Sequence, residues 1–370
     1  MSLHDEALTI FRHLAEIGPR RAGSPQEATA AAFVNGRLRH AGMGVTTHPL
    51  LVSPRRRRLY AAAAAAGIFG ALTALFLPLP SLVLALVAIM ALALDATVGP
   101  LAPIGPRRAS QSIIGTQAIA GGAGLAPRSP RWRVVILAPL DSPTVTSGLS
   151  ALADPSLAAA LARVIALALV GLAALAELVI PNRGWVLLVA PAATLLALQL
   201  AAALRGPRPT PHDRNLGALT AMVLATQHLL ALEHVEVWAA AVGASSIDPG
   251  GIEDLLKIYP FEPERTLIIA LEQLGCGQLC YNVDTRRAHQ EIASMIALAA
   301  TACQIVAVER PHAGGAWLTE PLRRRGLRAI SVYGHSDSHE PAAACQAAAP
   351  LSEDAARLVA AIIEQLEDGG

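Results

Sequence analysis

The chain has 370 residues, of which 53% are hydrophobic and 15% charged, whereas about 25% of the residues of an ordinary soluble domain are charged. The formal net charge is +1 and no basic stripe is interleaved with aromatic residues, so the sequence does not indicate nucleic-acid binding. The excess apolar residues are concentrated in four segments, which predicts an integral membrane protein whose first partner is the lipid bilayer.

The N-terminal segment contains two predicted helices and a strand. Residues 3–17 show the apolar spacing of an amphipathic helix. Ser24-Pro25-Gln26-Glu27 has the form of a capping box with proline at the first helical position, and the helix that it begins is predicted to end at His40. A strand is predicted for residues 45–52. The chain therefore opens with part of a soluble domain.

Two pairs of long apolar segments follow, each pair joined by a short turn that contains proline. The four segments are residues 59–77, 81–98, 155–180 and 185–204. Each reaches or approaches the roughly 20 residues that an α-helix needs to cross about 30 Å of hydrocarbon. Buried helices of a large soluble core are the alternative, but such helices usually keep a polar face, and residues 61–77 have none. We therefore predict two transmembrane hairpins, at residues 59–98 and 155–204.

Three charged residues lie inside the predicted spans. Glu177 and Arg163 are within about two turns of the ends of the third span, where long side chains can reach the headgroups. Asp95 is near the end of the second span. Since the hairpin topology brings Asp95 and Arg163 toward the same membrane face, we predict that they pair.

Arginines predict the orientation of the hairpins. They flank the long soluble connections at Arg55–Arg58, Arg107, Arg108, Arg205 and Arg208, whereas the two short turns hold only Arg183. By the positive-inside rule, the termini and the soluble residues face the cytoplasm, in a membrane of the bacterial inner or plasma type. A run of four arginines could instead bind nucleic acid, but its position beside a span favours the topological role.

Helices and apolar strands alternate in the rest of the chain. The strands are predicted at residues 112–116, 132–137, 235–241, 266–271, 305–308 and 329–332. The helices are predicted at residues 216–232, after Pro249, and at residues 287–302, 319–325 and 352–366. The almost wholly apolar segment 132–137 is typical of a central strand. We predict an α/β fold with a mixed central sheet covered by helices on both faces, formed by one discontinuous domain of residues 1–58, 99–154 and 205–370.

The four cysteines do not form a disulfide framework or a zinc knuckle. They are Cys276, Cys280, Cys303 and Cys345. We interpret them as reduced thiols that act as small buried hydrophobes. The alternative is that Cys276 and Cys280 share one metal ion.

Several loops that follow predicted strands carry motifs in the order of a known family. The motifs are Ile17-Gly18-Pro19-Arg20-Arg21-Ala22-Gly23-Ser24, Ala138-Pro139-Leu140-Asp141-Ser142, His212-Asp213-Arg214-Asn215-Leu216-Gly217, Val242-Gly243-Ala244-Ser245-Ser246, Ala270-Leu271-Glu272-Gln273-Leu274-Gly275 and Gly334-His335-Ser336-Asp337-Ser338-His339. In this order they resemble metallopeptidase family 28, the dinuclear zinc aminopeptidases, whose relatives include glutaminyl cyclases and noncatalytic membrane proteins such as nicastrin. The resemblance covers the soluble residues and implies a zinc-exopeptidase-like fold, interrupted here by the two hairpins.

The resemblance also implies two zinc ions, which would lower the pKa of a bridging water while a carboxylate moves its proton. The His of the family's His-x-Asp motif is Pro139 here, and only Asp141 of that motif is kept. Asp213 stands at the position of the bridging carboxylate. Arg214 replaces the neighbouring Asn and is expected to supply a positive charge where the family places cations.

The rest of the implied site is altered as well. Ser245 and Ser246 occupy the family's Glu-Glu positions, so the general-base position holds a serine, which cannot act as a base near neutral pH without an activating partner. Glu272 can stand in for the later acidic ligand. The final His can be His335 or His339. The candidate metal ligands are thus Asp213, Glu272, His335 and His339, fewer for each zinc than the usual three. We expect zinc to be lost or reduced to a single weak site.

Two functions follow from these motifs. The first is a membrane-anchored homologue of zinc aminopeptidases that is catalytically impaired and binds a peptide or a protein. The second is an active metal-dependent peptidase or amidohydrolase with a depleted site, or with a relocated site at His335-x-Asp337-x-His339. The sequence leaves open whether the chain is an enzyme. A channel or transporter has little support, because the predicted spans contain few polar groups.

Overall fold

The chain divides into two compact units, each with its own core. The computed structural model describes residues 2–52, 55–74, 76–97, 108–117, 130–145, 148–153, 157–205, 208–209, 213–227, 229, 232–245, 250–283, 289–311, 318–336 and 348–369. The α/β unit comprises Met1–Val52, Arg108–Pro143 and Pro209–Gly370, and the helical unit comprises Ser53–Arg107 and Thr144–Arg208.

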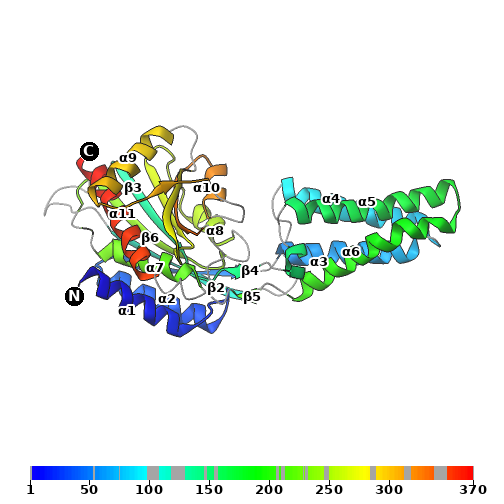
Figure 1. Ribbon diagram of the computed structural model, residues 1–370, viewed down its shortest axis with the longest axis horizontal. Helices are drawn as coiled ribbons and strands as arrows, with labels where there is room; N and C mark the ends of the chain where they lie inside the picture. The colour runs from blue at the N-terminus through cyan, green and yellow to red at the C-terminus, as the bar shows by residue number, and fades with distance from the viewer. Residues whose placement is uncertain are drawn as a thin grey trace. The chain divides into compact units, whose positions relative to one another are not determined.

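The α/β unit is built on one mixed eight-stranded sheet in the order β1-β2-β6-β3-β7-β10-β8-β9 (Figure 1). Its strands are β1 (Gly44–Val52), β2 (Arg108–Gln117), β3 (Trp132–Pro139), β6 (Val235–Val242), β7 (Thr266–Glu272), β8 (Gln278–Val283), β9 (Val308–Glu309) and β10 (Arg328–His335). Strands β6, β3, β7 and β10 are parallel, whereas β1, β2 and β8 pair with antiparallel neighbours. The predicted mixed sheet is confirmed. Two further strands, β4 (Thr144–Val145) and β5 (Arg208–Pro209), pair with each other.

Strand β3 lies inside the sheet because both of its faces are apolar. Val134 and Ile136 belong to one core cluster, while Val135 and Leu137 belong to the other, and all four are fully buried. Successive side chains of a strand point to opposite faces, so a strand covered on both faces needs a continuous apolar run. The central strand predicted for residues 132–137 is confirmed by its parallel pairing with β6 and β7.

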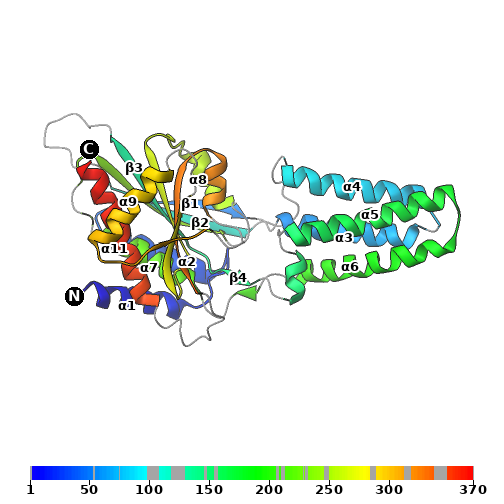
Figure 2. The same cartoon turned by 45° about the horizontal axis from the view of Figure 1, so that its top comes forward.

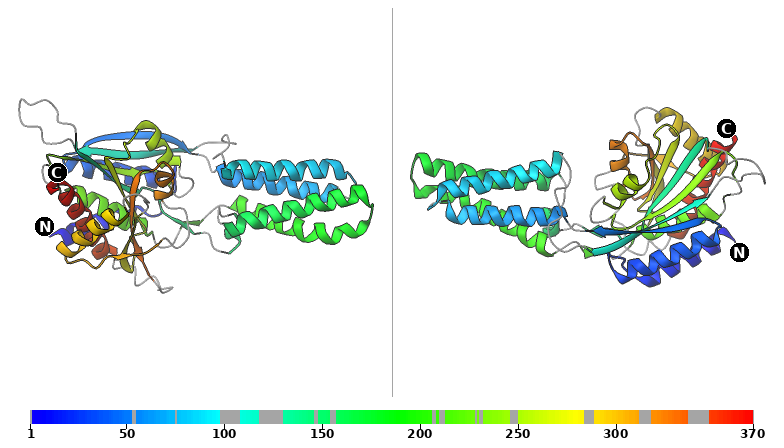
Figure 3. Two further views of the ribbon diagram at one scale, coloured as in Figure 1. Left: turned by 90° about the horizontal axis from the view of Figure 1, so that it is seen from above. Right: turned by 180° about the vertical axis from the view of Figure 1, so that it is seen from behind.

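Helices cover both faces of the sheet (Figure 3). The larger core includes residues of α1 (Leu3–Ile17), α2 (Pro25–His40), α7 (Asn215–Gln227), α9 (His289–Ala302) and α11 (Ala348–Asp368). The core on the other face includes residues of α8 (Gly250–Ile258) and α10 (Thr319–Arg324). Helix α2 begins at Pro25 as predicted, and the Ser24 hydroxyl accepts a hydrogen bond from Glu27 N at 3.2 Å. The Glu27 side chain binds Gly23 N, so the second bond of the predicted capping box is replaced by this one.

Three elements differ from the prediction. The helix predicted for residues 216–232 ends at Gln227, and the strand predicted for residues 305–308 is the two-residue β9. Strand β8 is absent from the sequence prediction. It pairs antiparallel with β10 near the edge of the sheet and carries polar Gln278 and Asn282, so it lacks the apolar run of the central strands.

The helical unit is a bundle of four long helices (Figure 2). They are α3 (Arg55–Thr73), α4 (Pro78–Thr97), α5 (Leu157–Val179) and α6 (Val186–Arg205), with short 3₁₀ helices at Gly148–Ala153 and Arg183–Trp185. Three segments are long and apolar enough to cross a membrane: Pro78–Asp95, Ala158–Val179 and Leu187–Arg205. Helix α3 begins with four arginines, which leaves too short an apolar stretch to meet the same criterion. The prediction of four spans is thus supported for three helices.

The outer surface of the bundle is apolar. Among the large apolar side chains that the structure shows to be exposed, all but four belong to the helical unit; the exceptions are Leu51, Ile258, Leu298 and Val306. Phe76 and Leu187 are more than 80% exposed. Water disfavours so large an apolar surface, whereas hydrocarbon accepts it, so this distribution is typical of helices that face lipid.

Small residues dominate the inside of the bundle. Its core consists mostly of alanines, together with Leu167, Val170, Val189 and Leu196. A Cβ atom added at Gly67 of α3 would lie 2.6 Å from a methyl group of Leu167 and 2.7 Å from one of Leu196. The helices therefore approach closely at this glycine, as helices do in transmembrane bundles.

Candidate functional site

The motifs of the sequence gather at one edge of the sheet. Strand β3 ends at Pro139, β6 at Val242, β7 at Glu272 and β10 at His335, and these four strands are parallel. In open α/β sheets, ligands bind at the carboxyl ends of the strands. The candidate site is therefore the set of loops that follow these four strands, together with the start of α7.

Asp141 and Ser245 form the first pair at this edge. Asp141 is fully buried in the loop after β3. Its Oδ1 accepts hydrogen bonds from Ser245 N at 2.9 Å and from Ser245 Oγ at 2.5 Å. The serine at the predicted general-base position thus uses its hydroxyl as a donor that holds a carboxylate in place.

Two hydrogen bonds and one ion pair hold the Asp213 carboxylate. Its Oδ2 accepts a hydrogen bond from Ser142 Oγ and lies 2.9 Å from Arg20 Nη2, while its Oδ1 accepts one from Asn215 N at 3.0 Å. Ser142 and Arg20 also bind each other, since Arg20 N donates to Ser142 Oγ and Ser142 N donates to Arg20 O, both at 2.8 Å. Both oxygens of the predicted bridging carboxylate therefore have protein partners.

Arg20 carries the positive charge of the site. Its side chain is fully buried, and Nε donates to Leu140 O at 2.8 Å. The contact of Nη2 with Asp213 is an ion pair without the direction of a good hydrogen bond, and Nη1 has no hydrogen-bond partner in the described part of the chain. Burial lowers the pKa of Arg20 from its usual range, whereas the neighbouring carboxylates, Asp213 first, favour the charged form. An arginine remains charged when buried, so it depends on this ion pair.

The positive charge beside Asp213 was expected from Arg214, whereas the cation that the structure shows in contact with Asp213 is Arg20. Arg214 is exposed, and its side chain packs against Gly275. The amide expected next to Asp213 is supplied one residue later by Asn215. Asn215 Nδ2 donates to Asp141 O at 2.9 Å, and its Oδ1 accepts from the backbone N of the residue after β7 at 3.4 Å. This side chain therefore joins the loops after β3 and β7 to the start of α7.

Glu27 is a buried carboxyl group in the same region. Its Oε2 accepts a hydrogen bond from Gly23 N at 2.6 Å, and its Oε1 accepts from Ser110 Oγ at 2.8 Å and Ala244 N at 3.3 Å. Burial raises its pKa to about 7, against the three donors, which favour the ionised form; the charge of Asp141 adds to the rise. Ala244 has a φ of 56°, a strained conformation for a residue with a side chain. Glu27 thus holds this turn beside the candidate site.

The raised pKa of Glu27 predicts a pH dependence of stability. A carboxyl group with a pKa near 4.5 when unfolded and about 7 when folded stabilises the fold fully below pH 4.5, and this contribution is lost as the pH rises through 7. The shift corresponds to roughly 3 kcal/mol. We expect the free energy of unfolding to fall between pH 5 and about pH 8, and Glu27→Gln to flatten this slope. Chemical denaturation of the parent protein and of Glu27→Gln between pH 5 and about pH 8 measures this slope. If the free energy of unfolding changed with pH equally in both proteins, the raised pKa of Glu27 would be contradicted.

Two of the remaining predicted metal ligands, Glu272 and His335, are among the described residues. Glu272 ends β7, and its two oxygens accept hydrogen bonds from Leu318 N at 3.0 and 3.1 Å. His335 is the last residue of β10. Several residues named from the sequence lie outside the described residues: Arg107, His212, Ser246, Asp337, His339 and Cys345. Among the described cysteines, Cys276, Cys280 and Cys303 form no disulfide.

The described residues do not fit the zinc site that the family resemblance implies. No three His, Cys, Asp or Glu side chains among them lie close enough together to hold one metal ion. Pro139 has no side-chain ligand atom, Ser245 donates to Asp141, and both oxygens of Asp213 face protein donors. These positions bind one another rather than presenting free carboxylate oxygens to a cation.

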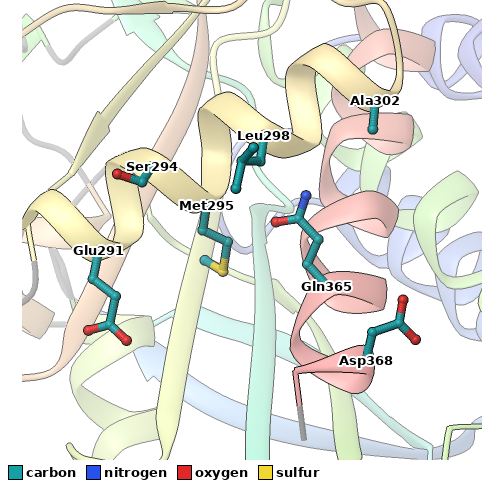
Figure 4. A pocket seen from close by; sticks show the side chains of 7 residues that line it. All are labelled: Glu291, Ser294, Met295, Leu298, Ala302, Gln365 and Asp368. Carbon is teal, nitrogen blue, oxygen red and sulfur yellow. The ribbon is translucent and has the colours of Figure 1, made fainter.

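A hollow of about 700 Å³ lies between α9 and α11 (Figure 4). It is lined by Glu291, Ser294, Met295, Leu298, Ala302, Gln365 and Asp368. None of these residues belongs to the motifs of the candidate site, so the hollow is a separate feature of the α/β unit.

Sequence reasoning missed the groups that hold the carboxylates in place. Arg20, Ser142 and Asn215 lie within the motifs, but the motifs assign them no role. Glu27 is read from the sequence only as a capping residue. Their roles come from contacts between segments that are far apart in the chain, such as the 122 residues between Arg20 and Ser142. The one available signal in the sequence is the pair Arg20 and Arg21, which stands in the otherwise apolar and glycine-rich segment 17–23.

No family model matches the sequence, and no curated protein matches it. Solved structures do match. A zinc aminopeptidase from Bacillus subtilis is similar with a TM-score of 0.56 and 12% identity, over 98% of this chain and 94% of that one. An aminopeptidase from Aneurinibacillus sp. strain AM-1 gives 0.55 and 11%, over 98% and 93%. A glutaminyl cyclase from Fimbriiglobus ruber gives 0.52 and 11%, over 98% and 94%. The likeness shows a zinc-exopeptidase-like fold, as the sequence predicts.

Proposed function

We propose that this chain is a membrane-anchored homologue of zinc aminopeptidases that does not hydrolyse peptides and instead binds a peptide or protein partner at the carboxyl edge of its sheet. The similarity in fold to zinc aminopeptidases and to a glutaminyl cyclase supports the homology. Three helices that are long and apolar enough to cross a membrane support the anchor, with α3 as a fourth span. The arginines beside the helix ends favour a cytoplasmic α/β unit.

The observation that carries this proposal is the hydrogen bond from Ser245 Oγ to Asp141. Hydrolysis by a metal-bound water needs a carboxylate or an equivalent base to accept the proton of that water. At the family's general-base position this chain has a hydroxyl that already serves as a donor. Asp213, at the bridging position, is likewise engaged by Arg20 and Ser142.

Metal analysis of the purified full-length protein tests the proposal. We expect less than one zinc ion in ten chains and no turnover of aminopeptidase substrates above background. Asp213→Ala should change neither result, and Arg214→Ala, an exposed neighbour, serves as the matched control. The alternative function, a peptidase or amidohydrolase using Asp213, Glu272, His335 and His339, predicts one zinc per chain. In that case Asp213→Ala removes both the metal and the turnover while Arg214→Ala keeps them.

The membrane anchor has its own test. We expect the full-length protein to remain in the membrane fraction after extraction at high pH. In sealed right-side-out vesicles, a C-terminal tag should be protected from added protease, because the arginines favour a cytoplasmic C-terminus. Release of the protein from the membrane at high pH would contradict the proposed anchor. Digestion of the tag would contradict the proposed cytoplasmic orientation.

A further inference from the structure

Polar side chains are buried inside the helical unit, one on each of its four long helices. They are Tyr60 on α3, Asp95 on α4, Arg163 on α5 and Gln199 on α6, and each is more than nine-tenths buried. Ser81 is also buried, but its hydroxyl donates to Gly70 O at 2.7 Å within the first hairpin. The remaining core is alanine, leucine and valine. We call the four residues Tyr60, Asp95, Arg163 and Gln199 the polar layer.

Contacts between the helices place three of these residues near one end of the bundle. Arg57 Nη2 donates to Ala202 O at 2.7 Å, which aligns α3 with the antiparallel α6. Tyr60 is about one turn further along α3, and Gln199 is about one turn back along α6, so both residues lie near this contact between the two helices. The guanidinium of Arg163 lies 3.8 Å from the centre of the Tyr60 ring.

Asp95 belongs to the same end of the bundle. It lies two residues before the end of α4 at Thr97, and α4 packs against α5, which starts at Leu157. Arg163 is in the second turn of α5 and donates from Nη1 to Leu152 O at 2.9 Å. The polar layer therefore lies within about two turns of the helix ends that connect the bundle to the rest of the chain. The pairing of Asp95 with Arg163 stays a prediction.

Gln199 differs from the other members of the layer. Tyr60, Asp95 and Arg163 all have interaction partners. Gln199 is 2% exposed, and neither its Oε1 nor its Nε2 has a hydrogen-bond partner within the described residues. An amide buried without partners costs on the order of 1–3 kcal/mol by mutational data, and more in hydrocarbon, where water cannot reach it. Because leaving the Gln199 amide unpaired costs this much free energy, we expect the amide to have a hydrogen-bond partner in the native protein.

We propose that Gln199 holds a water-sized guest and that the polar layer is a hydrated site inside the bundle. The chemistry of the amide selects the guest. Oε1 needs a donor and Nε2 needs an acceptor, so a cation or an anion would satisfy only one half of the side chain. A small neutral molecule that both donates and accepts satisfies both, and water is the guest of this class that reaches a site near the end of a bundle. This inference concerns the helical unit and is independent of whether the α/β unit binds metal or peptide.

The sign of a stability change tests the proposal in the full-length protein. Leucine is branched and shorter than glutamine, whereas methionine is unbranched like glutamine, so Gln199→Leu is paired with Gln199→Met to separate packing from hydrogen bonding. If water satisfies the amide, the substitution loses those hydrogen bonds, and we expect the unfolding midpoint in bilayer nanodiscs to fall by about 4 °C. If the amide is dry and unpartnered, removing it raises the midpoint, and the proposal is overturned. Gln199→Met provides a second apolar variant of similar volume and is expected to change the midpoint in the same direction.

A direct measurement on the unsubstituted protein complements the stability test. In protein with ¹⁵N-labelled glutamine in bilayers, the Nε2 signal of Gln199 is identified by its loss in Gln199→Leu. We expect that signal to receive magnetisation from water, as an exposed amide does. No transfer, or transfer only from protons of a lipid hydroxyl, which deuterated lipid would abolish, overturns the hydrated site.

Discussion

Replacing Arg20 with methionine should destabilise the α/β unit by about 3–5 kcal/mol, the usual cost of removing one partner of a buried ion pair. Arg20 is fully buried, and its guanidinium is the cation in contact with Asp213. Methionine fills much of the same volume, so the loss is electrostatic rather than a cavity. It leaves the carboxylates of Asp213 and Asp141 without this charge and removes the donor to Leu140 O. Urea unfolding of the full-length protein at pH 7 measures the change.

Two further variants separate charge from packing. Arg20→Met combined with Asp213→Asn removes both charges of the pair, and we expect it to recover a large part of the lost stability. Arg214→Met removes the neighbouring exposed arginine and should change the free energy of unfolding by less than about 0.5 kcal/mol. Equal effects of Arg20→Met and Arg214→Met would contradict the role assigned to Arg20.

The sequence predicts the central strands and the helices of this fold better than the strands near the edge of the sheet. The run at residues 132–137 predicts β3 because a strand buried on both faces has to be apolar at every position. Ser24 and Glu27 predict the start of α2 because capping depends on residues only three apart. Strand β8 and the short β9 are stabilised by pairing with neighbours from elsewhere in the chain, so local pattern does not find them.

The candidate site also shows that local sequence pattern does not reveal contacts between distant segments. Ser245 and Asp213 are found by their places in the motif order, but their bonding partners are not. The sequence suggests Arg214 as the nearby cation because it is adjacent in the chain, whereas Arg20 reaches Asp213 only through the folded loops. Adjacency in the chain is a poor guide here, because neighbouring side chains at a helix start point in different directions. The tertiary contact decides which arginine meets the carboxylate.

Gly217→Ala should be at least as damaging as the loss of Arg20. Gly217 is in the first turn of α7, and a Cβ atom there would overlap the carbonyl group of Leu274 in the loop after β7. That neighbour is backbone and cannot rotate away, so α7 and the loop would have to separate. Helix α7 lies at the centre of the larger core, with most of its residues buried, and the separation would also stretch the contact between Asn215 Oδ1 and Gln273 N. We expect a loss of about 3 kcal/mol or more in the free energy of unfolding.

The matched control is the same substitution at Gly36 in α2. A Cβ atom at Gly36 meets nothing within 4 Å, and the residue is inside a helix, where alanine is favoured over glycine by about 0.5–1 kcal/mol. Gly36→Ala should therefore stabilise the protein while Gly217→Ala destabilises it, and denaturant unfolding of the two variants gives opposite shifts. Hydrogen exchange shows where the destabilisation occurs, since the amides around Gln273 should lose protection in Gly217→Ala but not in Gly36→Ala. If both variants were as stable as the parent, the loop after β7 would not lie against α7, and the carboxyl edge of the sheet could not hold Asp141, Asp213 and Asn215 in the arrangement from which the loss of peptidase chemistry is inferred.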